Sequence, residues 1–404
     1  MIASELERKV SLQDAEGLID EYFKENRIRV ELSRFGDPLS STVATLHLPD
    51  GSTCVGCGKG YEAEARVGAK FEAYEHHVGL AGIRAHGSVV HFSEMARQSV
   101  WENFLPLDMI RKQNPEKIAA IEFEANIDER GALLFPQFLI DYLYATNRRG
   151  EDDVDYHDAK RYSCGTGLAV GVGFEEAAIH ALSEVIERHA VGRFLADLFF
   201  YQISPSIKIV SRETFPAGLA DLVAHAETLI GGRVDIIDVG SEIRAPVFAA
   251  YCQDRDIAGV HVIGAGCSLY PTHAAARAVK ELVQQYKIAD GVELVRREWA
   301  RHYMHLEKYP KLLRCLIADM SAIRRQEVAM AYDPPAMNLA SHLDHLLAAC
   351  RFAGTSAWVK QLRLEMNGIC LACAVMPKME RFSTVSLGNY VIPTCNPAMR
   401  VEMV

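Results

Sequence analysis

The chain has 404 residues and a net charge of −10, with 49% hydrophobic and 24% charged residues, as in ordinary soluble globular proteins. The negative charge argues against broad binding to nucleic acid or anionic membranes. No apolar run is long enough to span a bilayer, and the polar, acidic N-terminus resembles neither a signal nor a transit peptide. We therefore expect a cytoplasmic protein with mostly reduced cysteines and two or three packed subdomains.

Hydrophobic periodicity and turn signals predict the elements of the first 160 residues. They are a helix over 12–23, strands over 28–32 and 42–48, a helix over 61–80, and short strands over 119–123 and 133–135. The connection over 86–160 is otherwise irregular. Its polar segment 147–158 is either an exposed loop or a lid over a ligand.

The second half of the chain continues as a mixture of helices and strands. The predicted elements are a helix from 174, strands over 234–239, 246–251 and 259–263, a helix over 272–287, a largely helical stretch over 292–330, a helix over 338–352, and strands over 358–364 and 369–375. Asn367-Gly368 favours a hairpin between the last two strands. The fold class is therefore α+β.

A glycine-rich stretch followed by a helix with polar groups on one face occurs three times. In the central copy, glycines at 165–173 precede Glu184 and Glu187, which are three residues apart and so share one helical face. Taken alone, this pair could be a solvated acidic face with Arg188 as its ion-pair partner. Its recurrence favours a nucleotide site, in which glycine-rich turns face phosphates and carboxylates hold Mg²⁺.

The other two copies carry similar groups at similar spacings. Upstream, glycines at 56–60 precede Glu72 and Glu75; downstream, glycines at 264 and 266 precede Arg277, Glu281 and Gln284. We predict one nucleotide site between the three helices. Its metal ligands would come from five acids: Glu72, Glu75, Glu184, Glu187 and Glu281.

Common alternatives for these motifs fit less well. Neither the P-loop pattern nor G-x-G-x-x-G in its usual setting is present in the sequence. Two C-x-x-C pairs, Cys54/Cys57 and Cys370/Cys373, lie in strand-like apolar stretches more than 300 residues apart. We interpret the second pair as small core residues and assign no metal to cysteine.

The acid-bearing motifs resemble those of the YcaO family of ATP-dependent peptide-modifying enzymes. Glu184-Val185-Ile186-Glu187-Arg188 matches the family's E-x-x-E-R, and Arg277-Ala278 with Glu281 and Gln284 matches R-A-x-x-E-x-x-Q. The first motif keeps Glu72 and Glu75, but Gly68 replaces the usual Ser and His76 the usual Arg. Thr166 stands where many members have Asn. We expect a YcaO-type fold with an N-terminal helix and strands over 1–55, a catalytic domain over 56–377 and a tail over 378–404.

The resemblance implies ATP and Mg²⁺ as cofactors and a cyclodehydration of Cys, Ser or Thr in a ribosomally made precursor peptide. The catalytic residues it implies are Glu187, Arg188 and Arg277, and the nucleotide-binding residues are Lys59, Gly68, Thr166, Arg188, Arg277 and Gln284. Arg277 and Lys59 are candidates for phosphate contacts, and Arg188 for a phosphate contact or an orienting ion pair. For Lys59, a solvated turn lysine is an equally good interpretation.

Among family members, the chain looks most like the stand-alone cyclodehydratase subunits of microcin-type azole synthetases. This similarity implies a leader-binding, ubiquitin-activating-enzyme-like subunit, an FMN-dependent azoline dehydrogenase, and possible self-association. Many relatives end in a proline-rich tail that reaches the active site, whereas here only Pro397 lies near the end; we expect either that the tail is dispensable or that the natural C-terminus is longer. Thioamide formation and a non-catalytic scaffold stay open as alternatives.

Overall fold

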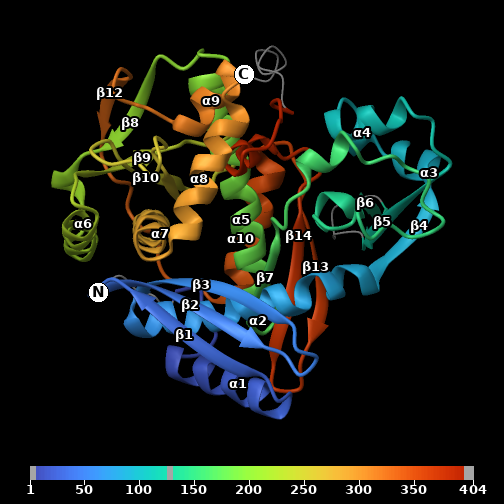
Figure 1. The fold of residues 1–404 in the computed structure, drawn as a ribbon, viewed down its shortest axis with the longest axis horizontal. Coiled ribbons are helices and arrows are strands. Elements are labelled where there is room, and N and C mark those ends of the chain that lie inside the picture. The colour runs from blue at the N-terminus through green and yellow to red at the C-terminus, as the bar shows by residue number, and fades with distance from the viewer. Residues whose placement is uncertain (1–5, 125–130, 395–404) are drawn as a thin grey trace.

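The computed structural model describes residues 6–124 and 131–394, and within them it confirms the α+β class (Figure 1). The described residues form four separate β-sheets, and the long helix α5 (Phe174–Leu195) runs through the middle of the molecule. Residues 395–404, with Pro397, lie outside the described residues, so only the first part of the predicted tail can be followed.

The N-terminal layer is an antiparallel sheet backed by two helices. Its order is β1-β2-β3, and α2 packs directly on β2 and β3 while α1 packs on α2. The bounds are α1 (Leu12–Glu25), β1 (Arg29–Phe35), β2 (Leu39–His47), β3 (Thr53–Tyr61) and α2 (Glu62–His86). The predicted helix over 61–80 is thus confirmed, and it continues to His86.

A smaller lobe follows α2 and contains the sheet β4-β5-β6. Its elements are β4 (Gly87–His91), α3 (Phe92–Ala96), α4 (Leu105–Arg111), β5 (Lys117–Phe123) and β6 (Leu133–Pro136). The polar segment 147–158 is fastened to this lobe through Asp152, which is buried. The Asp152 carboxylate accepts hydrogen bonds from the Ala119 backbone N at 3.0 Å, from Tyr144 at 2.9 Å and from Tyr156 at 2.8 Å.

The other two sheets flank α5. The sheet β13-β14-β7 packs against α5, and the five-stranded sheet β11-β10-β9-β8-β12 carries α7 on β10 and β11. The remaining bounds are β7 (Leu168–Val172), β8 (Ser206–Val210), α6 (Ala217–Ile230), β9 (Val234–Asp238), β10 (Val247–Cys252), β11 (Ile263–Cys267), α7 (Pro271–Gly291), α8 (Glu293–Leu306), α9 (Pro310–Ile317), β12 (Arg324–Val328), α10 (Leu339–Phe352), β13 (Trp358–Leu364) and β14 (Ile369–Val375). The predicted β13–β14 hairpin is confirmed.

The first and third glycine clusters are not turns, which corrects the prediction. Residues 56–60 lie inside β3 and residues 264 and 266 lie inside β11, and each strand packs on the helix that follows it. A Cβ on Gly58 would come within 1.8 Å of the Ala65 carbonyl oxygen, and one on Gly264 within 2.2 Å of the Ala278 oxygen. Glycine is needed there because the helix backbone lies directly against the strand, not because a phosphate does.

Other predictions differ from the structure on the outer side of the five-stranded sheet. The strand predicted over 259–263 is wrong, because these residues form an irregular connection and the strand begins at Ile263. Strand β8 and helix α6 were not predicted. Residues 324–328, expected to be helical, form β12 and pair in parallel with β8. No helix among the described residues has the length and apolar character needed to cross a membrane.

Candidate nucleotide-binding and catalytic site

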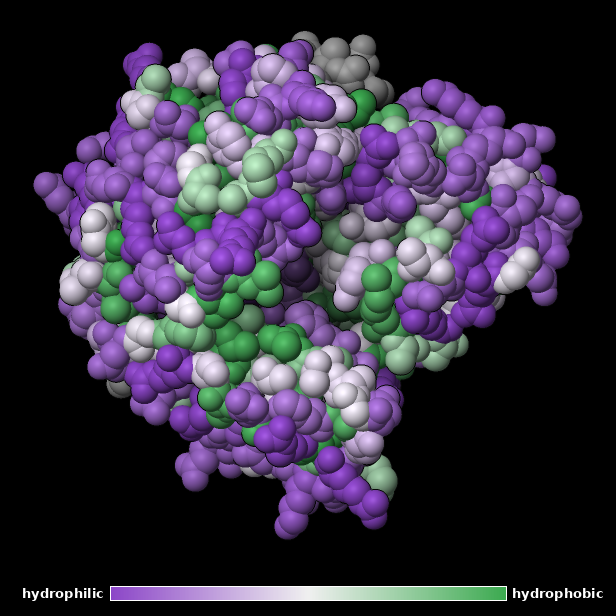
Figure 2. Space-filling model, in the orientation of Figure 1, coloured by the Kyte–Doolittle hydropathy of each residue, from purple (hydrophilic) through white to green (hydrophobic). Residues whose placement is uncertain are grey.

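A cavity of about 760 Å³ opens where α2, α5 and α7 meet. Figure 2 shows that this face of the molecule is hollowed near its centre. All the predicted site residues line the cavity: Lys59, Gly68, Glu72, Glu75, Thr166, Glu184, Glu187, Arg188, Arg277, Glu281 and Gln284. The cavity therefore brings together all eleven residues singled out from the sequence.

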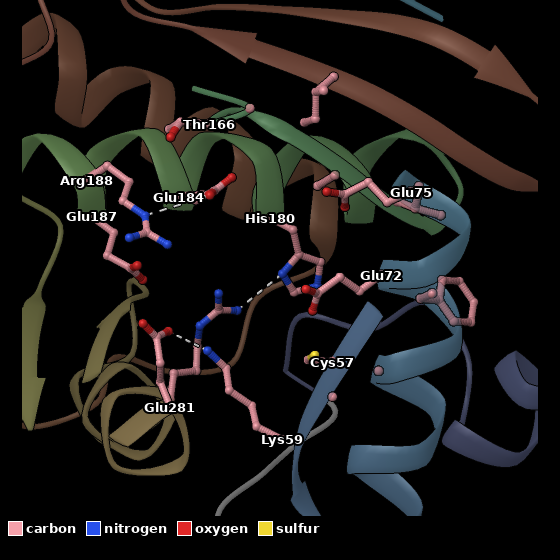
Figure 3. A pocket seen from close by; sticks show the side chains of 18 of the residues that line it. Cys57, Lys59, Glu72, Glu75, Thr166, His180, Glu184, Glu187, Arg188 and Glu281 are labelled. Carbon is pink, nitrogen blue, oxygen red and sulfur yellow. Dashed lines mark hydrogen bonds and ion pairs between the residues drawn. The ribbon is translucent and has the colours of Figure 1, made fainter. Parts of the chain in front are cut away.

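The three-residue spacing places the acids as the helical pattern predicts. Glu72 and Glu75 project from α2 toward α5, which carries Glu184 and Glu187 (Figure 3). Two hydrogen bonds join helices of the site to neighbouring backbone. The Gly167 backbone N donates to Glu184 Oε2 at 3.1 Å, and Gln284 Nε2 donates to the Cys57 carbonyl at 2.8 Å.

The basic side chains lie between the acids. Lys59 Nζ contacts Glu281 Oε2 at 2.5 Å, and Arg188 Nε lies 3.8 Å from Glu184 Oε1 on the same helix. Lys59 belongs to strand β3, so its interpretation as a solvated turn lysine is wrong. Arg277 Nη1 donates to His180 Nδ1 at 3.3 Å, and His180 therefore has no proton on that nitrogen.

Burial makes the acids of α2 and α5 difficult to ionise. It raises the pKa of Glu72, Glu184 and Glu187, and it raises that of Glu75 far above its ordinary value, with Glu184 and Glu72 adding to the effect. Buried carboxylates with a raised pKa would be stabilised in their charged form by a cation placed between them. The donor set thus fits a divalent cation.

Glu281 behaves differently from the other acids. Burial opposes its ionisation, but Lys59 and Arg188 outweigh this and lower the pKa of Glu281. Among the residues described here, no three acid, His or Cys side chains are close enough to hold a metal ion by themselves. This arrangement suits Mg²⁺, which usually takes only one or two carboxylates and completes its shell with phosphate oxygens and water.

The departures in the first motif are accommodated at the cavity wall. A Cβ on Gly68 would touch only the Cα of Gly58, at 3.6 Å, so a side chain would extend into open space. The His76 ring pairs through Nδ1 with the Val55 carbonyl oxygen at 2.6 Å, and it opposes the burial that raises the pKa of Glu72. His76 thus contributes some of the positive influence expected from the usual Arg.

The structure decides how segment 147–158 and the two C-x-x-C pairs should be interpreted. Segment 147–158 does not line it and is held against β5, so its interpretation as a lid is wrong. Cys370 and Cys373 are buried inside β14, as predicted for small core residues. Cys54 and Cys57 lie in β3, and Cys57 lines the cavity, where burial raises its pKa to about 11.

Several lining residues escaped the sequence prediction. They are Glu7, Arg8, Glu64, Tyr142, Cys164, His180, His273 and Lys280, together with the segment 383–387 that follows β14. His180 lies four residues before Glu184 and so shares its helical face, a spacing that would have revealed it. Glu7 had no such signal, because its neighbours lie more than 260 residues away in the sequence.

The family model for YcaO cyclodehydratases, described as ATP- and Mg²⁺-binding, matches residues 57–380. The chain belongs to the YcaO family. The match confirms the resemblance read from the three motifs, and it confirms ATP and Mg²⁺ as the cofactors of this domain. No curated protein sequence matches the chain significantly.

Several solved structures have a similar fold. The YcaO from Methanopyrus kandleri bound with AMPPCP and Mg²⁺ is 19% identical, with a TM-score of 0.62 over 94% of this chain and 95% of that one. A heterocyclase in complex with substrate and cofactor is 17% identical, with a TM-score of 0.62 over 92% of this chain and 52% of that one. A chain of the E. coli microcin synthetase McbBCD complex is 15% identical, with a TM-score of 0.56 over 88% of both chains.

Proposed function

We propose that this YcaO protein is an ATP-dependent cyclodehydratase that converts Cys, Ser or Thr residues of a ribosomally made precursor peptide into thiazoline or oxazoline rings. The observation that carries the proposal is the convergence of five carboxylates with Lys59, Arg188 and Arg277 in one cavity. Such a site can neutralise a triphosphate and a divalent cation together, which is the main requirement for phosphoryl transfer.

The reaction overcomes the poor leaving ability of an amide oxygen. The peptide's own thiol or hydroxyl loses its proton and attacks the preceding carbonyl carbon, and the resulting oxygen accepts a phosphoryl group. The C–O bond then breaks, phosphate leaves, the amide nitrogen loses its proton and a C=N bond closes the ring. Bound ATP supplies the phosphoryl group, and Mg²⁺ supplies charge neutralisation.

The residues divide by charge in this scheme. Glu72, Glu75, Glu184, Glu187 and Glu281 are the proposed pool of metal ligands. Arg277 and Lys59 would contact phosphate oxygens, because guanidinium and ammonium groups are the usual phosphate partners. The contact of Arg188 with Glu184 supports a role in orienting that carboxylate. Thr166, Gly68 and Gln284 would complete the nucleotide pocket.

We further propose that the enzyme works with partner subunits. Its fold is similar to that of a chain in the E. coli microcin synthetase McbBCD complex, which is the basis for expecting a leader-binding subunit and an FMN-dependent azoline dehydrogenase. We expect the protein to process peptide poorly by itself, and it could also self-associate. Cytoplasmic location is part of the same proposal.

The test is reconstitution of the chain with precursor peptide, ATP, Mg²⁺ and candidate partner subunits, followed by mass spectrometry. Loss of one water per ring, dependent on ATP and on the partners, would support the proposal. Efficient dehydration by this chain alone would contradict the need for partners. Exchange of oxygen for sulfur, seen only with an added sulfur donor, would indicate thioamide formation, and the absence of any ATP turnover would favour a scaffold.

A further inference from the structure

The segment 6–9 contributes an acidic side chain to the wall of the cavity, and it lies outside the region that the family model matches. Glu7 is only 1% exposed, and its carboxylate accepts a hydrogen bond from Ser268 Oγ at 2.5 Å. Its two oxygens lie 3.6 Å from His273 Nε2 and from His342 Nε2. A carboxylate this deeply buried requires a compensating cation.

Neither histidine supplies that cation. Burial lowers the pKa of His273 to about 4 and also lowers that of His342, so both rings are neutral at neutral pH. Arg277 remains as the counter-charge. It lies one helical turn after His273 on α7, and Glu7, His273 and Arg277 all line the cavity.

Several carboxylates compete for the positive charge of Arg277. Burial disfavours its charged form, but Glu7 and then Glu187 outweigh burial and raise the pKa of Arg277, with Glu281 adding a smaller effect. Its guanidinium contacts the neutral His180, and its buried Nε has no hydrogen-bond partner among the described residues. Glu187 and Glu281, which compete with Glu7 for Arg277, are among the acids proposed to hold Mg²⁺.

The segment that carries Glu7 is held firmly in place. Arg8 Nη1 pairs with Glu176 Oε1 at 2.9 Å, and the Lys9 backbone N donates to Glu176 Oε2 at 2.8 Å. Glu176 is itself buried in the first turn of α5. The segment therefore connects α5 with α7, and Glu7 has a fixed position relative to both.

We propose that Glu7 is a positioning residue that holds Arg277 away from Glu187 and Glu281, so that these two carboxylates stay available to the metal–nucleotide complex. The proposal rests on the proposed function for the role of Mg²⁺ and ATP. Without the negative charge of Glu7, the acids that still attract Arg277 among the described residues are proposed metal ligands, Glu187 and Glu281 foremost. Arg277 would then pair with these carboxylates, and an incoming Mg²⁺ ion would have to displace the guanidinium.

The test compares Glu7→Gln with Glu16→Gln, the same substitution at an ion-paired carboxylate between α1 and α2 that lies outside the cavity. Glutamine keeps the size of Glu7 and an oxygen for Ser268. Titration calorimetry would measure the binding of Mg²⁺ with a non-hydrolysable ATP analogue. We expect binding to weaken about tenfold in Glu7→Gln, and to be unchanged in Glu16→Gln.

A nucleotide-free crystal structure of Glu7→Gln gives a readout independent of activity. We expect the Arg277 guanidinium within ion-pair distance of Glu187 or Glu281, and partial recovery of binding in Glu7→Asp. Unchanged binding with Arg277 in its present position would overturn the proposal, and so would equal weakening in Glu16→Gln. If the unmodified protein binds nucleotide but never dehydrates peptide, the proposed function fails while the positioning role of Glu7 is still decided by these measurements.

Discussion

Lys59 Nζ in β3 and Glu281 Oε2 in α7 lie 2.5 Å apart, although 222 residues separate them in the sequence. The pair joins the first and third glycine-and-helix units across the cavity. It also keeps Glu281 ionised while burial raises the pKa of the neighbouring acids of α2 and α5. Among the five proposed metal ligands, Glu281 is therefore the one whose pKa is lowered before a cation binds.

Replacing Lys59 with Met should disable this arrangement. Glu281 would lose its strongest counter-charge, and the triphosphate would lose a proposed contact, so we expect at least a tenfold loss of ATP turnover, as is usual when a charged contact to the transferred group is removed. Steady-state ATPase assays measure the loss. Lys59→Arg, which keeps the charge, is the control, and equal activity in Met and wild-type proteins would contradict the role.

Glu187→Ala should abolish ring formation and leave the fold intact. Glu187 is 3% exposed at the cavity wall, and its proposed role is to hold a metal rather than to pack the core. Mass spectrometry of the precursor peptide measures ring formation, and thermal unfolding measures the fold. The exposed Glu21→Ala on α1 is the matched control. A normal rate in Glu187→Ala would show that the metal role is wrong.

Two glycines close to each other should respond in opposite ways. Gly68→Ser should fold normally and keep or improve nucleotide binding, because its Cβ meets only Gly58 Cα at 3.6 Å and its hydroxyl would face the cavity. Gly58→Ala should destabilise the protein by several kcal/mol, because its Cβ would overlap the Ala65 carbonyl oxygen and separate β3 from α2. Urea unfolding of both variants measures the difference, and similar stabilities would contradict the close packing.

Glu16→Gln should lower stability in a pH-dependent way. Hydrogen bonds from Arg66 lower the pKa of Glu16 to about 2, with burial opposing them and Lys70 adding to them. A carboxylate whose pKa is lowered by folding stabilises the folded state at pH values above its pKa in the unfolded chain, which is near 4.5. This contribution is lost as the pH falls toward 2. Because the group is partly open to water, we expect a difference of about 1 kcal/mol at pH 7.

Urea unfolding of wild type and Glu16→Gln between pH 7 and pH 3 measures this difference, which should shrink as the pH falls. A constant difference over the range would contradict the assigned ion pairs.

The helices of the site could be predicted because their chemistry is local. The three-residue spacing of Glu72 with Glu75, and of Glu184 with Glu187, places each pair on one helical face in any fold. The glycines were misread for the same reason: their local pattern fits a turn, and only the packing of β3 on α2 and of β11 on α7 shows why a side chain is excluded.

Long-range partners carried no signal in the sequence. The first four residues of β12 are exposed and polar, and the strand forms because β8 provides an edge, so its pattern did not differ from that of an exposed helix. Glu7 resembles any acidic residue near a terminus until Ser268, His273 and His342 surround it.

The central claim is that the cavity between α2, α5 and α7 holds ATP and Mg²⁺. The most direct test is a crystal structure of this chain with a non-hydrolysable ATP analogue and Mg²⁺. We expect the triphosphate and metal between the carboxylates of Glu72, Glu187 and Glu281, with Arg277 or Lys59 in contact with a phosphate oxygen. Nucleotide bound elsewhere, with these side chains unmoved and no metal beside them, would contradict it.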